Sequence, residues 1–147
     1  MPRTHASRWR WALAGVLLLP VLLFGRALLP GRVLSPAGML FDWWPWRGLA
    51  HGPGASNPLL SDVAFVFHPW LAYARDSVRG GRLPLWNPHA FCGAPFLGNM
   101  QSALFSPFTA IAYVFPLPAA IGLAAIAKLM IAGAGMVALL RRFGMPP

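Results

Sequence analysis

The chain has 147 residues, of which 57% are hydrophobic and 10% are charged, and its mean hydropathy is +0.57. Soluble domains carry about 25% charged residues, which cover their surface, so this composition excludes an ordinary water-soluble globule. The net charge of +9 comes from twelve basic residues and three acids. Because the arginines flank apolar segments and form no dense basic stripe, we expect anionic phosphate, on lipids or on a lipid-linked substrate, as the partner, and no nucleic acid.

Residues 1–10 are basic and predict a cytoplasmic N-terminus, and residues 11–30 predict a first transmembrane helix. A run of about 20 mostly apolar residues is long enough to cross a bilayer core of about 30 Å. Arg26 near its end can reach the headgroups, and Pro20 can kink it. A cleaved signal peptide fits the same pattern, but no small-x-small cleavage site follows, so we favour an uncleaved anchor.

Residues 31–103 predict a long extracytoplasmic loop, because Gly and Pro recur at a density that breaks regular elements. Its tryptophans suit the membrane interface. Within it, residues 69–79 predict a short helix that begins at Pro69 and ends at Gly80-Gly81. Apolar side chains fall on one face and charged ones on the other. This helix therefore lies either in the interface plane or on the surface of a globular loop.

The C-terminal part predicts an interfacial or re-entrant segment at 104–118, a second transmembrane helix at 119–140 and a cytoplasmic end at 141–147. Ser106-Pro107 is a pattern that caps a helix. The second span holds one charge, Lys128, which should face a bundle interior or an aqueous cavity. Its small residues permit close approach of another helix: Ala124, Ala127, Ala132, Gly133 and Gly135.

These elements predict an all-α membrane protein in which two transmembrane helices flank a long external loop with short interfacial helices. Arginines near both ends of the chain favour cytoplasmic termini by the positive-inside rule. The single Cys92 leaves no intrachain disulfide. The histidines have no metal-ligand spacing, so we predict no metal site and expect loop or interfacial side chains: His5, His51, His68 and His89.

An ordered series of motifs begins at Asp62. It reads D-x5-H-P-W, then R-x3-R-G-G-R-L-P-L-W-N-P, then G-A-P-F-L-G-N-M-Q-S-A-L-F-S-P. This series resembles the N-terminal region of bacterial YfhO-type membrane proteins, which are similar to the GT-C class of glycosyltransferases. The resemblance covers about residues 61–144, and the order of the motifs is more specific than any one of them.

By this resemblance the chain is the start of a GT-C-like polytopic bundle in the bacterial plasma membrane. Its partners would be the lipid bilayer and the remaining transmembrane helices of the parent protein. Family members continue through many further spans, so we expect an N-terminal fragment that is inactive alone. The full-length protein would transfer a sugar from a polyprenyl-phosphate carrier to a cell-envelope acceptor, and the resemblance leaves a divalent metal cofactor open.

The resemblance makes Asp62 the catalytic candidate, with Asp42 as a secondary one. A carboxylate can accept a proton from the sugar acceptor or bind a hard cation through oxygen. The alternative for Asp62 is to cap the helix that follows it. Asp76 is expected to pair with Arg75 or Arg79 on the helix surface.

Other polar side chains can hold the substrate. The guanidinium groups of Arg75, Arg79 and Arg82 match phosphate oxygens, although contacts with lipid headgroups explain them equally. Lys128 can meet a phosphate or an acid on another helix. Three amides can hydrogen-bond a sugar or satisfy the backbone of a Pro-broken loop: Asn87, Asn99 and Gln101.

A second function fits the same composition. A small non-enzymatic membrane scaffold or assembly subunit needs only two spans and an aromatic interfacial loop, and it would not need a catalytic acid. Further apolar spans encoded beyond codon 147 would favour the glycosyltransferase.

Overall fold

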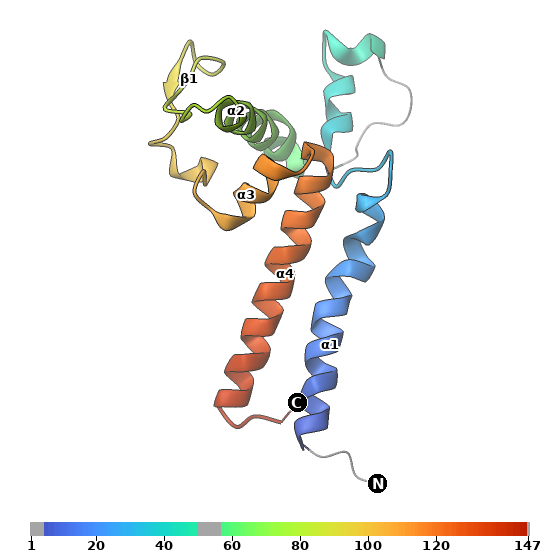
Figure 1. The fold of residues 1–147 in the computed structure, drawn as a ribbon. Coiled ribbons are helices and arrows are strands. Elements are labelled where there is room, and N and C mark those ends of the chain that lie inside the picture. The colour runs from blue at the N-terminus through green and yellow to red at the C-terminus, as the bar shows by residue number, and fades with distance from the viewer. Residues whose placement is uncertain (1–4, 50–56, 147) are drawn as a thin grey trace.

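The computed structural model describes residues 5–49 and 57–146, which are mostly helical. The start of the predicted basic N-terminus, the loop segment around His51 and the last residue of the predicted cytoplasmic end lie outside the described residues. The described elements form two parts: a long antiparallel pair of helices, and a smaller folded cap at the end of this pair remote from the two chain ends (Figure 1).

The long pair consists of α1 (His5–Phe24) and α4 (Leu117–Arg142). A 3-10 turn, Gly25–Leu28, continues α1, and the helix ends there because Leu29 precedes a proline and adopts extended backbone angles. The helical segment therefore begins and ends earlier in the chain than the predicted 11–30. The stretches Ser7–Leu28 and Leu117–Arg142, with mean hydropathies of 2.0 and 2.1, are long and apolar enough to cross a membrane.

Glycines on α4 let α1 approach closely. A Cβ atom at Gly133 would overlap Cγ1 of Val16, and one at Gly122 would lie 3.0 Å from Cδ2 of Leu28 in the turn that continues α1. Ile126 and Val137 are buried on the same side of α4. The sequence predicted that small residues of this span would let another helix approach. Gly133 lets α1 approach, whereas a Cβ atom at Gly135 would meet nothing within 4 Å.

The helix of the cap begins before the predicted Pro69. It continues from Asp62 through a π-helical turn, Val63–Phe67, into α2 (His68–Arg79). Proline has no N–H, and its ring displaces the carbonyl of the preceding turn, so a wider turn relieves the conflict. The N–H of His68 accordingly donates to the carbonyl of Val63, five residues back. The sequence prediction that Pro69 is the first helical residue was wrong.

The C-terminal end of α2 follows the sequence prediction. Gly81 has a φ of 70°, a left-handed conformation that glycine adopts without strain. The N–H of Gly80 donates to the carbonyl of Asp76, and that of Arg82 donates to the carbonyl of Ser77 at 2.9 Å. These bonds satisfy the last carbonyls of the helix, as in a Schellman cap.

A small core holds the cap together. Ala74 of α2 packs with Phe96 and Leu104, which are 2% and 7% exposed, and four partly buried side chains surround them: Trp70, Tyr73, Leu97 and Tyr113. A short antiparallel pair, β1 (Trp86–Asn87) and β2 (Ala94–Pro95), stands beside α2. Trp70 and Ala74 on the apolar face of α2 are therefore covered by the cap itself, whereas Val78 is 37% exposed.

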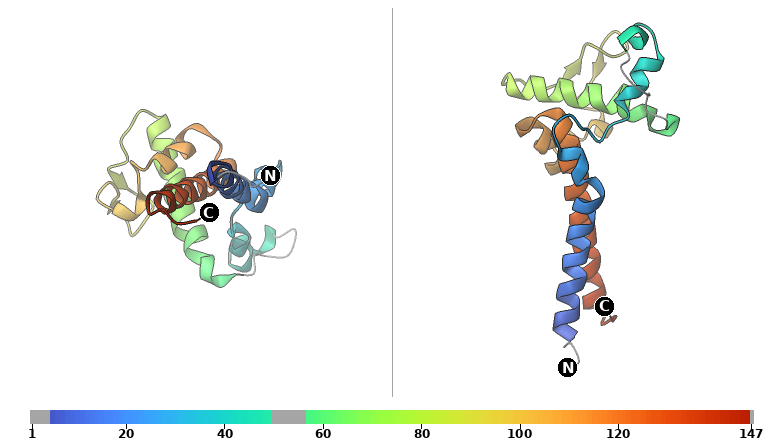
Figure 2. Two further views of the ribbon diagram at one scale, coloured as in Figure 1. Left: turned by 90° about the horizontal axis from the view of Figure 1, so that it is seen from below. Right: turned by 90° about the vertical axis from the view of Figure 1, so that its right-hand side faces the viewer.

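The helix α3 (Pro107–Val114) joins the cap to the long pair. Ser106 caps it by accepting a hydrogen bond from the N–H of Phe108 at 3.3 Å, as the Ser-Pro pattern predicts. It packs on α2 and on α4. Figure 2 shows that α2 lies across the end of the long pair, roughly perpendicular to α1 and α4.

The segment with the tryptophan cluster forms two 3-10 turns, Ala37–Asp42 and Trp46–Leu49, beside α2 (Figures 1 and 2). The first of them reaches the start of α4, since Leu40 and Ile121 line one cavity. Trp43 and Trp44 are 61% and 78% exposed there.

Candidate functional site

A cavity of about 430 Å³ opens along one side of α2. The α2 side contributes Phe65, Pro69, Tyr73 and Asp76, residues spaced by three or four positions so that they share one helix face. The opposite wall comes from the segment around β1 and brings three polar side chains: Arg82, Asn87 and His89. The cavity thus joins residues that are well separated in the sequence.

The wall around β1 is held in place by contacts with Tyr73. The hydroxyl of Tyr73 donates to the carbonyl of Trp86 at 2.5 Å, and its ring lies edge-on to His89, with centroids 5.7 Å apart. Gly93 has a φ of 112°, and a Cβ atom there would lie 2.6 Å from Nε1 of Trp86. A glycine is therefore required where the chain turns back beneath the indole ring.

Asn87 is one of two buried polar residues that line the cavity; it and Ser77 are each 4% exposed. Its side-chain oxygen accepts a hydrogen bond from the N–H of His89 at 2.9 Å. This bond closes an Asx turn and orients the His89 backbone. Its amide NH₂ group has no hydrogen-bond partner within the described residues, so it is available to an acceptor in the cavity.

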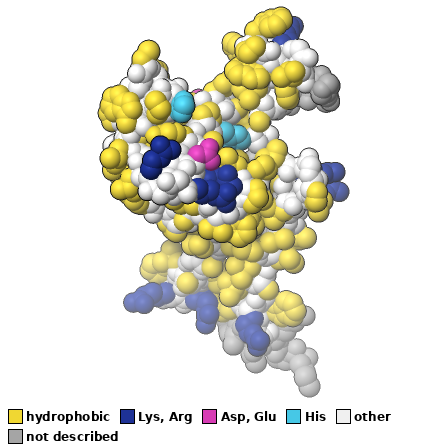
Figure 3. Space-filling model, turned by 45° about the horizontal axis from the view of Figure 1, so that its top comes forward, with side chains coloured by type: hydrophobic (Ala, Val, Ile, Leu, Met, Phe, Trp, Pro, Cys, Tyr) yellow, Lys and Arg dark blue, Asp and Glu magenta, His cyan; other side chains and the backbone are white. Residues whose placement is uncertain are grey.

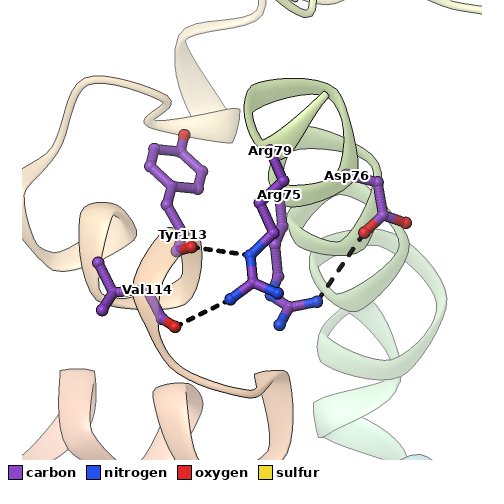
Figure 4. Close-up of polar contacts among 5 residues, drawn as sticks. All are labelled: Arg75, Asp76, Arg79, Tyr113 and Val114. Atoms are coloured by element: carbon purple, nitrogen blue, oxygen red, sulfur yellow. Dashed lines mark hydrogen bonds and ion pairs between the residues drawn. The ribbon is translucent and has the colours of Figure 1, made fainter. Parts of the chain in front are cut away.

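Asp76 supplies the carboxylate at the cavity. Its side chain is 76% exposed, and it forms an ion pair of 3.9 Å with Arg75 (Figure 4), one of the two pairings expected from the sequence. A pair this long and this exposed contributes little stability, so the carboxylate remains able to accept hydrogen bonds. Arg82 lines the same cavity, which therefore holds groups of both charges.

The two remaining arginines of the predicted phosphate site have other surroundings. Arg79 donates from Nε to the carbonyl of Tyr113 at 3.0 Å and from Nη2 to the carbonyl of Val114 at 2.9 Å (Figure 4). These carbonyls belong to the last turn of α3, where helices lack internal partners. Arg75 is largely buried, and its Nε has no partner within the described chain. Of the three arginines, Arg82 alone lines the cavity.

Asp62 and Asp42 are exposed and lie outside the cavity lining. Asp62 accepts no capping hydrogen bond at the start of the π-helical turn, so the helix-cap alternative gains no support. Trp43 meets Phe65 edge-on with ring centroids 6.2 Å apart. This contact brings the segments that carry the two acids side by side, and Phe65 itself lines the cavity.

The last three predicted site residues lie away from the cavity. The side-chain oxygen of Asn99 accepts from the N–H of Gln101 at 3.1 Å, which is the backbone role left open by the sequence, and Gln101 is exposed. Lys128 is exposed on α4, with Nζ 5.5 Å from the ring centroid of Phe108 on α3. Lys128 is therefore not on the buried side of α4, which faces α1.

The chemistry of the cavity fits a sugar. Aromatic rings offer flat apolar faces to the C–H side of a pyranose, and the amide, imidazole and carboxylate can exchange hydrogen bonds with hydroxyl groups. Trp70, Tyr73 and His89 supply rings that the sequence analysis did not select. The spacing of Pro69, Tyr73 and Asp76 by three or four residues could have indicated that helix face. The described residues contain no cluster of metal-binding side chains.

Figure 3 shows basic, acidic and histidine side chains close together on the cap, bordered by hydrophobic side chains. No model of a protein family matches the chain, and neither a curated protein nor a solved structure is similar to it. The YfhO-type resemblance therefore remains an expectation.

Proposed function

We propose that this chain is a membrane protein whose cap binds a sugar, as the N-terminal part of a GT-C-like glycosyltransferase. In the full-length protein, the sugar would pass from a polyprenyl-phosphate carrier to a cell-envelope acceptor. The observation that carries the proposal is the cavity beside α2, where Asp76, Arg82, Asn87 and His89 converge among aromatic rings. Both the ordered motifs and this cavity fall within the same stretch of chain.

The support for a membrane location is the exposure of the two long helices. Only 6% of the most apolar window of the first and 11% of that of the second are buried. The core helix of a soluble protein would be mostly buried, whereas lipid compensates for exposed leucines. The close approach of Val16 to Gly133 packs α1 against α4.

The support for a phosphate-linked sugar is the charge distribution in the cavity. A guanidinium group such as that of Arg82 forms paired hydrogen bonds with phosphate oxygens. A carboxylate can accept a proton from an attacking hydroxyl group. We assign this base to Asp62 on the strength of the motif order, and Asp76 to the binding of sugar hydroxyls because it lines the cavity.

The binding proposal is tested with the purified chain in detergent and a panel of sugars and sugar phosphates, by saturation-transfer NMR or thermophoresis. Asp76→Asn and Asn87→Ala should each weaken binding about fivefold to tenfold, the effect of losing one good hydrogen bond. Asp42→Asn is the matched control, since it makes the same change outside the cavity, and it should bind as the wild type does. Equal weakening by Asp42→Asn, or no binding of any sugar, would contradict the proposal.

The assignment of the base is tested separately. In a protein that joins this segment to the further spans expected of such an enzyme, Asp62→Ala should abolish sugar transfer while sugar binding persists. Unchanged transfer would remove Asp62 from the mechanism without affecting the cavity.

A second candidate function, an assembly subunit, is favoured by one observation. Lys128 is exposed on α4, in a span that by its hydropathy belongs in lipid. A charge near the middle of a span costs about 2.5–3.5 kcal/mol unless it finds a partner. If the chain is part of a glycosyltransferase, Lys128→Met should leave sugar binding intact. If it is an assembly subunit, Lys128→Met should dissociate a defined membrane complex, which native electrophoresis would detect.

A further inference from the structure

A second cavity, of about 400 Å³, lies where the cap meets the end of the long helices. Its walls come from the segment after α1, from α2 and from the first turns of α4, and nearly all of them are apolar, as at Leu40, Ala64 and Ile121. His68 is the single titratable side chain among the residues that line it. An apolar cavity beside a membrane span is accessible to lipid chains, which fill such spaces more favourably than water does.

The hydrogen bonds of His68 leave one ring nitrogen without a partner. The hydroxyl of Ser35 lies 3.3 Å from Nδ1 and already accepts the N–H of Ala37 at 3.0 Å. We assign the hydroxyl proton to the bond with Nδ1, so that Nε2 carries the ring proton. Nε2 is buried and has no hydrogen-bond partner within the described residues. A buried donor without an acceptor is costly, so an acceptor bound at Nε2 would stabilise the protein.

Burial lowers the pKa of His68, so the ring is neutral at physiological pH and donates as a neutral N–H. The described residues that line the cavity include no Asp, Glu, Lys or Arg. A neutral donor in apolar walls suits a neutral acceptor, such as a carbonyl oxygen, better than a phosphate.

The level of the cavity in the membrane matches the position of one such carbonyl oxygen. The 26 residues of α4 rise about 1.5 Å each, or about 39 Å in total, whereas the hydrocarbon core is about 30 Å thick. The first turns of α4, with Leu117 and Ile121, therefore lie near the boundary between hydrocarbon and headgroups. The ester groups of phospholipids lie at this boundary.

We propose that this cavity binds one acyl chain of a membrane phospholipid, whose ester carbonyl accepts a hydrogen bond from Nε2 of His68. The acyl chain lies against the apolar wall formed by Leu40, Ala64 and Ile121. The bound lipid seals the junction between cap and membrane. The sugar cavity shares Pro69 and Ala72 with this cavity, but its polar groups lie outside it and stay free. This site is independent of the proposed sugar transfer, because it uses a different cavity and needs no sugar.

The ligand-side experiment uses the wild-type chain in vesicles of phosphatidylethanolamine and phosphatidylglycerol. A trace of phosphatidylethanolamine with a photoreactive diazirine on one acyl chain is added, and labelled peptides are mapped by mass spectrometry. Labelling should concentrate on the segments that contain Leu40, Ala64 and Ile121, above the level at exposed span positions such as Leu22 and Ile131. A diether analogue of the same probe lacks the ester carbonyl and should label these segments about fivefold less.

The protein-side experiment compares two histidine variants. His68→Phe removes the donor and retains an aromatic ring, so it should lower labelling of the cavity about fivefold to tenfold. His68→Gln keeps an N–H donor and should retain part of the labelling. His89→Phe makes the same change in the sugar cavity and should leave lipid labelling unchanged.

A third variant fills the space. Ala37→Phe places a ring in the lipid cavity and should exclude the chain while His68 is intact. Equal labelling by ester and ether probes, or labelling spread evenly along the exposed span faces of the wild type, would overturn the proposal. Both of these results are obtained with the unaltered chain and do not depend on how any variant folds.

Discussion

The guanidinium group of Arg79 donates to two backbone carbonyls of α3, whereas that of Arg82 lines the cavity beside α2. The two arginines lie three residues apart and look equivalent in the sequence. Their different roles arise because Arg79 is on the last turn of α2 that meets α3, while Arg82 follows the Gly80-Gly81 turn and reaches the other side.

We predict that Arg79→Gln destabilises the cap by about 1 kcal/mol, because two exposed charge-assisted hydrogen bonds to α3 are lost. The measurement is thermal unfolding of the purified chain in detergent. Arg82→Gln is the matched control and should unfold like the wild type while binding sugar phosphates more weakly. A loss of stability in Arg82→Gln equal to that in Arg79→Gln would show that the two side chains are not divided in this way.

His68 predicts a dependence of stability on pH. Burial lowers the pKa of its ring from the ordinary value of 6.5, so the unfolded chain binds a proton more readily than the folded chain. The contribution of the neutral ring to stability is therefore fully present above pH 6.5 and decreases as the pH falls below it. Unfolding temperatures measured from pH 8 to pH 5 should decrease more in the wild type than in His68→Gln; parallel curves would argue against this role.

At the scale of elements, two local features determine where the helices lie. The π-helical turn Val63–Phe67 absorbs Pro69 without ending the helix, so α2 and the segment from Asp62 form one continuous rod. Gly133 allows α4 to touch α1 at Val16, which keeps the two spans together below the cap. The first feature was not predicted from the sequence, because a proline is also favoured at the first position of a helix.

We predict that Gly133→Ala loosens the α1–α4 contact by about 1–3 kcal/mol, because its Cβ atom would clash with the stiff, β-branched Val16. Protease resistance of the detergent-solubilised chain reports the contact. Adding Val16→Ala should restore most of the loss by removing the clashing methyl group. Gly135→Ala is the control, since its Cβ atom meets nothing within 4 Å; equal sensitivity of the two glycine variants would refute the proposed packing.

At the scale of the whole molecule, the hydrophobic surface of the two long helices lies between two regions that carry charges (Figure 3). The cap is at one end, and Arg141 and Arg142 close α4 at the other, next to the start of α1 (Figure 1). This layout fits a hairpin across a bilayer, with both chain ends on the side favoured by positive charge.

We predict that the cap faces the outside of the cell, and Cys92 provides the test. It is the only cysteine of the chain, and it is exposed. A membrane-impermeant maleimide should label Cys92 in intact cells. In a Cys92→Ser background, a cysteine introduced at Met145 should react only after lysis. Labelling of Met145→Cys, and not of Cys92, in intact cells would mean that the orientation is reversed.

Composition and local pattern alone determined that the chain has two apolar helices, a Ser106-Pro107 helix start and a stop at Gly80-Gly81. Each of these depends on neighbouring residues: a helix must be long enough for a bilayer, a cap needs a side-chain oxygen, and a left-handed turn needs glycine. Tertiary structure decided which polar side chains share a cavity. Asp76 and Asn87 meet because Tyr73 binds the carbonyl of Trp86 and Gly93 admits its indole ring. Such contacts join segments distant in the chain, and no local spacing encodes them.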